Sequence, residues 1–275
     1  MINGKKIVSQ EQVMILMEDV ERRYGYDFTH YTIASLSRRI NQLCLLDNFA
    51  SFAELRYRVL HEPEYMQRFV EKMTVNVTEM FRDPSFFLRL RHEILPKLGT
   101  SPFIRIWIAG CATGEEAYSL AILLQEAKLL HKSLIYATDI NPSVLEQAKR
   151  AVIPMANLKS YVENYQLSGG KADFSSYYTA NYKWVKLTSS LQERIVFASH
   201  NLVSDASFNS FQLILCRNVL IYFDTQLQAK VLSLFDESLE TLGYLALGSQ
   251  ETLRFSVLAP DYQQVGNEKI WRKVK

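Results

Sequence analysis

Four short apolar segments in the second half of the chain restrict its possible folds more than any other feature. Each is rich in β-favouring residues, and they read 103-FIRIWIAG-110, 133-SLIYATDI-140, 194-RIVFASHN-201 and 211-FQLILCRN-218. Helical patterns lie between or after most of them, at 115–130, 142–151 and 224–240. Continuously apolar strands that alternate with helices predict a parallel α/β sheet with helices on both faces.

The first part of the chain has a different hydrophobic period. From about Gln10 to Lys97, apolar residues recur at helical spacing between short breaks, and Ser51 with Glu54 three residues later fits a capping box. The sequence therefore predicts a helical N-terminal domain over 1–73, a linker and helix over 74–100, and an α/β domain over 101–275.

One region interrupts the alternation of strands and helices. Between Ala151 and Ser190 lie Pro154, the pair Gly169-Gly170 and the aromatic run 177-YYTANYKWVKL-187, which together exceed a usual strand–helix connection. We expect a small antiparallel β-subdomain here, inserted at about 155–192. Further strands are expected in the main domain at 242–249, 262–266 and 269–274.

Composition narrows the functional classes. A hydrophobic fraction of 48% and a charged fraction of 22% are ordinary for a soluble globular protein, and a net charge of +2 favours neither nucleic acid nor a membrane surface. The three cysteines lack metal-ligand spacing, and the five histidines form no evident cluster, so no metal is expected. With polar first residues and no run of 18 apolar residues, the sequence predicts a cytoplasmic protein.

Polar residues follow each predicted strand. The first strand ends in Gly110-Cys111-Ala112-Thr113-Gly114, and the others end in Asp139, Asn201 and Arg217-Asn218. Any one of these could simply terminate its strand. Because ligands bind beyond the carboxyl ends of parallel strands, the set together indicates a binding crevice.

The residues at this edge favour an adenosine-containing cofactor that carries positive charge. A glycine turn admits a ligand close to the backbone, and an acid such as Asp139 commonly holds a ribose. The turn is not G-x-G-x-x-G, and Glu115 and Glu116 would repel a pyrophosphate, which counts against a nicotinamide-dependent oxidoreductase. S-adenosylmethionine, with its sulfonium and ammonium groups, suits such a site, although either glutamate could instead be a first-turn helix residue.

Several motifs together resemble the CheR-type chemotaxis protein methyltransferases, which esterify glutamate side chains on chemoreceptors. The matching stretches, in order, are 74-TVNVTEMFRDPSFF-87, 107-WIAGCATGEEAYSLA-121, 137-ATDIN-141, 200-HNL-202 and 215-LCRNVLIYFD-224. The helical N-terminal domain, the inserted β-subdomain and a reversed final hairpin also match the family plan. The resemblance implies a Rossmann-like methyltransferase sheet, the cofactor S-adenosylmethionine and the product S-adenosylhomocysteine.

Site residues carry over by position. The cofactor contacts implied by the family, with the glycine turn, are Asn76, Thr78, Arg82, Gly110, Glu116, Asp139, Asn201, Leu202, Arg217 and Asn218. Arg82 and Tyr222 are the candidate catalytic residues. Arg82 could hold the substrate carboxylate or the cofactor's own carboxylate, or be a solvated helix arginine. Tyr222 could equally be a packed aromatic.

The family also implies a partner. Arg38 and Arg39 would meet the cytoplasmic region of a chemoreceptor, which could dock on the β-subdomain as well, although two merely exposed arginines are an equal interpretation. A monomer is expected. The family often has Gly-His-Ser-Glu where this chain reads 248-GSQE-251, so two alternatives stay open: a regulatory module that binds the cofactor without methyl transfer, and a methyltransferase acting on a non-receptor protein.

Overall fold

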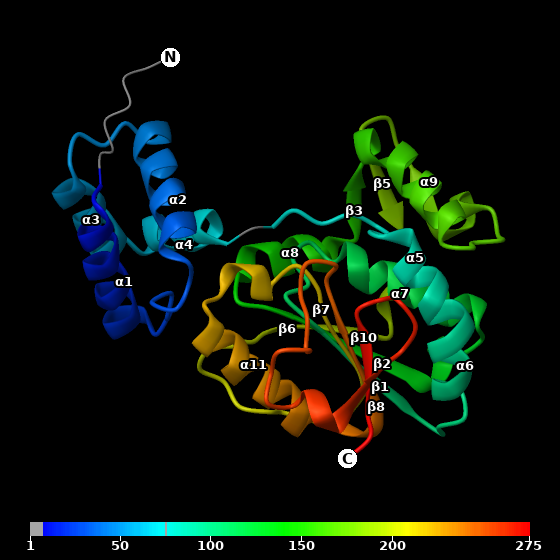
Figure 1. Ribbon diagram of the computed structural model, residues 1–275. Helices are drawn as coiled ribbons and strands as arrows, with labels where there is room; N and C mark the ends of the chain where they lie inside the picture. The colour runs from blue at the N-terminus through cyan, green and yellow to red at the C-terminus, as the bar shows by residue number, and fades with distance from the viewer. Residues whose placement is uncertain (1–7, 75) are drawn as a thin grey trace. The chain divides into compact units, whose positions relative to one another are not determined.

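A computed structural model describes residues 8–74 and 76–275, so the first residues, whose polarity contributed to the prediction of a cytoplasmic protein, lie outside the described part. The chain forms two compact units (Figure 1). One unit comprises Met1–Val75 with Ile221–Lys230, and the other comprises Asn76–Leu220 with Val231–Lys275. The sequence did not predict that residues 221–230 belong to the N-terminal unit.

The N-terminal unit is helical. Its first four helices are α1 (Gln10–Tyr24), α2 (Ile33–Leu46), α3 (Phe52–His61) and α4 (Pro63–Met73). Local signals set their ends: Ser9 forms a capping box with Gln12, the Ser51 hydroxyl accepts a hydrogen bond from the Glu54 backbone N–H, and Pro63 opens α4. The buried faces of the helices pack into one core around residues such as Leu16 and Phe69.

The second unit contains a seven-stranded sheet in the order β6-β2-β1-β7-β8-β10-β9. Its parallel strands are β1 (Ile104–Ala109), β2 (Ser133–Asp139), β6 (Ile195–Ser199), β7 (Phe211–Cys216) and β8 (Leu239–Leu247). The last two strands, β9 (Tyr262–Gln264) and β10 (Ile270–Lys273), pair antiparallel. The mixed α/β class and the reversed final hairpin are confirmed, while β8 begins three residues before the predicted strand.

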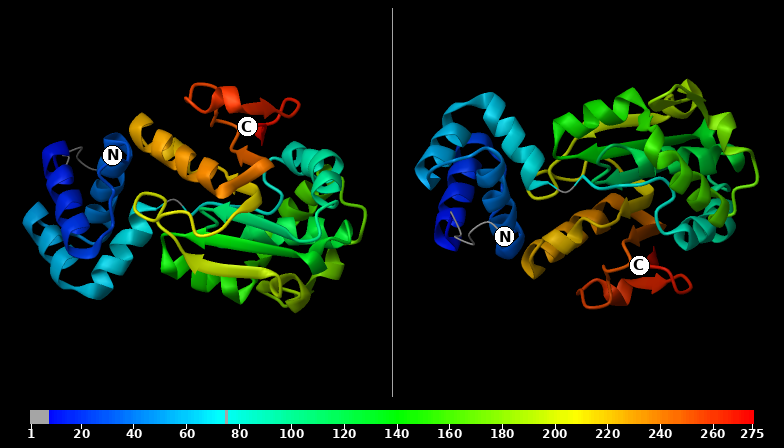
Figure 2. Two further views of the ribbon diagram at one scale, coloured as in Figure 1. Left: turned by 90° about the horizontal axis from the view of Figure 1, so that it is seen from below. Right: turned by 90° about the horizontal axis from the view of Figure 1, so that it is seen from above.

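Helices cover both faces of this sheet (Figure 2). The helices of this unit are α5 (Pro84–Arg89), η1 (Leu90–Ile94), α6 (Leu95–Leu98), α7 (Glu115–Glu126) and α8 (Pro142–Arg150), with short helices η2 (Leu130–Lys132), α10 (Ser189–Gln192) and η6 (Ala259–Asp261). The residues of η5 (Leu220–Tyr222) and α11 (Thr225–Ser238) are divided between the two units. Side chains of a strand alternate between faces. Ile106 and Ile108 therefore join the core shared with α7, whereas the Trp107 ring contacts Phe235 of α11 on the opposite face.

The inserted subdomain contains a three-stranded antiparallel sheet, as predicted, in the order β3-β5-β4. Its elements are β3 (Val152–Pro154), η3 (Met155–Asn157), α9 (Leu158–Leu167), η4 (Phe174–Tyr177), β4 (Tyr178–Ala180) and β5 (Trp184–Leu187). Helix α9 was not predicted. The carboxylate of Glu126 at the end of α7 accepts hydrogen bonds from Tyr165 and, at 3.0 Å, from Tyr177, which fixes the subdomain to the main sheet domain.

None of the helices built by the described residues is long and apolar enough to cross a membrane.

Candidate functional site

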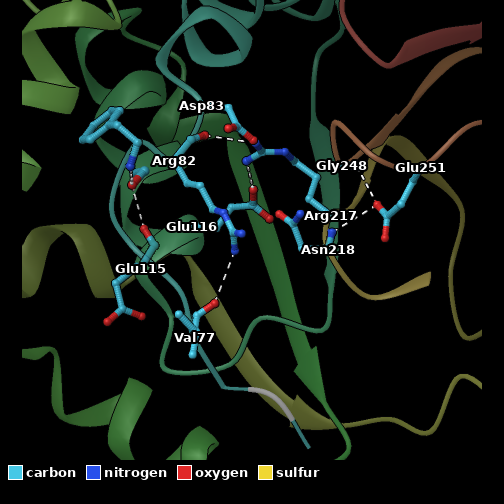
Figure 3. Close-up of polar contacts among 11 residues, drawn as sticks. Val77, Arg82, Asp83, Glu115, Glu116, Arg217, Asn218, Gly248 and Glu251 are labelled. Atoms are coloured by element: carbon cyan, nitrogen blue, oxygen red, sulfur yellow. Dashed lines mark hydrogen bonds and ion pairs between the residues drawn. The ribbon is translucent and has the colours of Figure 1, made fainter. Parts of the chain in front are cut away.

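The site lies at the carboxyl ends of the central parallel strands, where the connecting loops bond to one another. The backbone N–H of Gly110, after β1, donates to the Thr138 carbonyl oxygen in β2, and the His200 N–H, after β6, donates to the Asp139 carbonyl oxygen. Arg217, after β7, donates to Glu116 at the start of α7 (Figure 3). The structure thus brings together the loops that follow β1, β2, β6 and β7.

The glycine turn after β1 is shaped by packing as well as by room for a ligand. Gly110, Ala112 and Gly114 all have positive φ, at 79°, 47° and 91°. A Cβ on Gly110 would come within 2.4 Å of the Val219 side chain. The interpretation that small residues here only admit a ligand is therefore incomplete, because Gly110 also lets the loop after β7 approach the turn.

Asp139 organises the turn from the end of β2. Its carboxylate accepts hydrogen bonds from the backbone N–H of Ala112 at 2.9 Å and of Asn141 at 3.0 Å. Burial raises the pKa of Asp139, and backbone hydrogen bonds partly oppose that shift. A carboxylate has about four acceptor positions, so its bonds to the backbone still leave capacity for a ribose hydroxyl.

The two adjacent glutamates have different surroundings. Glu115 is buried and accepts a hydrogen bond from the Thr113 hydroxyl at 2.6 Å, and burial raises the pKa of its carboxyl. Glu116 instead accepts from the Arg217 guanidinium at 2.6 Å. Figure 3 shows the two carboxylates pointing to different sides of α7. Glu116 therefore belongs to an ion-pair network and Glu115 bonds within the turn, while a role of either acid towards a cationic ligand stays a prediction.

Arg217 is the centre of that network. Its side chain is only 3% exposed and bridges Glu116 to Asp83, whose carboxylate accepts at 2.6 Å. The same guanidinium donates to the Arg82 carbonyl oxygen at 3.0 Å and lies 4.1 Å from the ring centre of Phe86. These bonds make its side chain an anchor for residues 82 and 83. The cofactor contact that the resemblance implies for Arg217 stays a prediction.

The Arg82 side chain is much less constrained. Its guanidinium donates to the Val77 carbonyl oxygen at 3.3 Å, in an exposed contact. The preceding segment is held from both sides, since the Phe81 N–H donates to the Ser119 hydroxyl at 2.9 Å and the Asn164 amide donates to the Met80 carbonyl oxygen at 3.1 Å. The backbone of Arg82 is therefore fixed while its charged end remains available.

Glu251 supports the loop after β7, a role that the sequence did not predict. Its buried carboxylate accepts from the backbone N–H of Gly248 at 2.6 Å, Asn218 at 3.1 Å and Val219 at 2.9 Å. The departure 248-GSQE-251 keeps Gly248 and Glu251, and it changes two exposed positions, 249 and 250. An acid three residues after a strand-ending glycine was the signal available to find this role.

The remaining predicted residues do not all join this site. Asn76, Thr78 and Leu202 are partly exposed, and the side-chain oxygen of Asn201 accepts from the Val203 N–H at 2.9 Å. Tyr222, Arg38 and Arg39 belong to the helical unit. Among the described residues no group of three or more His, Cys, Asp or Glu side chains could hold a metal.

The site's chemistry fits a cofactor that carries positive charge. Carboxylates outnumber guanidinium groups among the strand-end residues and the segment that bonds to them. The carboxylates are those of Asp83, Glu115, Glu116, Asp139 and Glu251, and the guanidinium groups are those of Arg82 and Arg217. An acidic sheet edge of this kind suits a sulfonium and an ammonium better than a pyrophosphate.

Comparison with known proteins agrees with this chemistry. The model of the CheR methyltransferase SAM-binding domain matches residues 76–267, and that of the CheR methyltransferase all-alpha domain matches residues 15–74. The cofactor is therefore S-adenosylmethionine, as the sequence predicted.

Relatives match over nearly the whole chain. The Cher3 protein of Pseudomonas putida, named as a methyltransferase, is 45% identical over 263 residues, or 95% of this chain and 96% of that protein. Chemotaxis protein methyltransferase 1 of Pseudomonas aeruginosa is 30% identical over 84% of this chain and 85% of its own length. The chemotaxis protein methyltransferase of Listeria innocua is 29% identical over 85% and 87%. The chain belongs to the CheR family of S-adenosylmethionine-dependent methyltransferases.

Proposed function

We propose that this protein transfers a methyl group from S-adenosylmethionine to glutamate side-chain carboxylates of chemoreceptors. The products are a glutamate methyl ester and S-adenosylhomocysteine. The observation that carries the proposal is the combination at Arg82: a backbone anchored by the Arg217 network and a guanidinium with one weak main-chain contact. The names of the relatives, chemotaxis protein methyltransferases, support receptors as the substrate class.

The residues can perform this reaction without a general base. When bound, the cofactor would supply an electrophilic methyl group to a carboxylate oxygen of the substrate, and the sulfur would keep the electron pair of the broken C–S bond. A glutamate titrates near pH ~4.3, so the nucleophile is already ionised at neutral pH. Alignment is then the main task of the protein, and proximity can lower the barrier by about 7–11 kcal/mol.

We assign Arg82 to that alignment, because a guanidinium can hold a carboxylate by two parallel hydrogen bonds. Asp139 would hold the ribose, and Asn201 with Leu202 would meet the adenine from the loop after β6. The backbone of Asn218 and the segment from Asn76 to Thr78 would border the cofactor. Gly110, Glu116 and Arg217 would act by shaping this edge, through the contacts described above.

The proposal extends to location and partners. The cytoplasmic region of a receptor is its substrate, so the protein acts in the cytoplasm, and we place receptor docking at the β3-β5-β4 subdomain, with the enzyme as a monomer. A purely regulatory module is less well supported, since the altered 248-GSQE-251 retains Glu251, which bonds to the loop after β7, and Gly248, whose N–H bonds to Glu251.

Radiolabelled methyl transfer to receptor cytoplasmic fragments tests the proposal. Wild type should label the fragments, and alkaline treatment should release the label as methanol because the product is an ester. Arg82→Ala should lower the rate by roughly two orders of magnitude, since a positioned carboxylate loses both hydrogen bonds.

Two controls sharpen this experiment. Arg105→Ala removes a half-exposed arginine that pairs with Glu240 near the start of β1, and it should retain activity. Calorimetric titration with S-adenosylmethionine, and with NAD as a negative control, separates binding from turnover. Cofactor binding without labelling of any receptor fragment would refute the receptor substrate, and full activity of Arg82→Ala would remove Arg82 from the site.

A further inference from the structure

A short segment that follows the Arg217-Asn218 motif belongs to the helical unit. The Thr32 N–H donates to the Tyr222 carbonyl oxygen at 2.9 Å, and the Asp224 N–H donates to the His30 carbonyl oxygen at 2.9 Å. Tyr31 and Phe223 form an isolated antiparallel β-bridge between these bonds. The backbone of residues 222–224 is therefore held in strand-like register by residues 30–32.

Side chains reinforce the bridge. The rings of Tyr31 and Phe223 pack edge to face with centroids 5.0 Å apart, and His30 Nδ1 lies 3.0 Å from a carboxylate oxygen of Asp224. Neighbouring aromatic and polar pairs across a bridge each add modest stability. The segment is thus ordered by several independent contacts, and its conformation depends on the helical unit.

Arg39 adds a contact to Tyr222 itself. Its guanidinium carbon lies 5.1 Å from the centre of the Tyr222 ring, and the guanidinium also donates to the Met73 carbonyl oxygen. Arg39 is half-buried, and burial lowers the pKa of its guanidinium. Its neighbour Arg38 is exposed. Although adjacent in sequence, the two arginines therefore differ in kind: Arg38 is open to a partner, while Arg39 has its bonding within the unit.

We infer that Arg39 is a positioning residue for Tyr222, so that the helical unit orders the segment after the Arg217-Asn218 motif for methyl transfer. This inference rests on the proposed function together with the assignment, made from the sequence, of Tyr222 as a candidate catalytic residue. It replaces the hypothesis that both Arg38 and Arg39 bind the receptor: Arg38 keeps that assignment, and Arg39 acts through the tyrosine. A lysine cannot replace it fully, because only the planar guanidinium stacks on a ring while bonding sideways to a carbonyl.

Steady-state kinetics with receptor fragments test the assignment. Arg39→Ala should lower kcat by about tenfold, the loss expected for one half-buried cation–π contact, with little change in the KM for the receptor fragment. Arg39→Lys should recover part of this loss. A receptor-docking arginine behaves differently, and Arg38→Ala should raise the KM with little change in kcat.

Hydrogen exchange supplies a readout that needs no substrate. In Arg39→Ala, peptides that contain the backbone N–H of Asp224 should exchange about tenfold faster than in wild type, since the bridge opens more often. The matched control is Arg56→Ala, which removes an exposed arginine of the same unit that pairs with Asp19, and it should leave this exchange unchanged.

Two results would overturn the inference: unchanged exchange at Asp224 in Arg39→Ala, or a higher KM with an unaltered kcat. Failure of the proposed function is recognised separately, because the wild type would then label no receptor fragment. In that case the exchange comparison alone decides whether Arg39 orders residues 222–224.

Discussion

Replacement of Arg217 by alanine should destabilise the sheet-containing unit strongly. The Arg217 side chain is 3% exposed, and it pairs with Glu116, whose side chain is 14% exposed. Removing one partner of a buried ion pair leaves an uncompensated charge and costs about 3–5 kcal/mol. The Asp83 carboxylate is 40% exposed, so water replaces its lost bond and adds little to this cost. Because whole domains unfold at about 5–15 kcal/mol, the effect is a large share of the total.

Urea unfolding followed by tryptophan fluorescence measures this effect where it occurs. The three tryptophans, Trp107, Trp184 and Trp271, all lie in the unit that contains Arg217. Arg217→Ala should lower the unfolding midpoint markedly, whereas the control Arg105→Ala, which breaks a half-exposed pair, should cost about 1 kcal/mol or less.

A second variant isolates the physical cause. In the Arg217→Ala/Glu116→Gln double variant the buried charge is absent, so part of the lost stability should return, and the coupling between the two sites should be about 1–3 kcal/mol. The reasoning would be refuted if Arg217→Ala costs no more than Arg105→Ala, or if the double variant is simply the sum of the two singles.

Two further changes test the supports of the site. Gly248→Ala places a Cβ 2.8 Å from both the Asn218 nitrogen and a Glu251 carboxylate oxygen, so we expect a loss of about 1–3 kcal/mol in unfolding experiments; an unshifted urea midpoint would show that the loop yields freely. Asp139→Ala should weaken S-adenosylmethionine binding in calorimetry, and unchanged affinity would rule out the ribose assignment. Because burial raises the pKa of Asp139, the folded state binds a proton more tightly than the unfolded state does, so the free energy of unfolding should fall as pH rises from about 4 through that raised pKa. Asp139→Asn should flatten this decline, and an equal slope in the variant would assign it to other groups.

Local sequence patterns predicted most of the fold because the relevant signals are short in range. The apolar runs of β1, β2 and β7 were recognisable since buried parallel strands need apolar residues on both faces. Helix α9 was missed because Pro154 and the Gly169-Gly170 pair suggested only loops and strands in that region. The segment between them nevertheless has apolar residues at helical spacing that pack on the main core.

The sequence by itself determined the order of strands and helices, the strand-end position of the polar motifs and the family to which they belong. Only the tertiary structure decided how those polar residues are used. In it, Glu116 forms an ion pair with Arg217, and Glu251 accepts hydrogen bonds from the loop after β7. In the helical unit, the Arg39 guanidinium lies over the Tyr222 ring. The reason is physical: hydrophobic period is a local property of a chain, whereas the partner of a buried charge is fixed by loops that meet from distant parts of it.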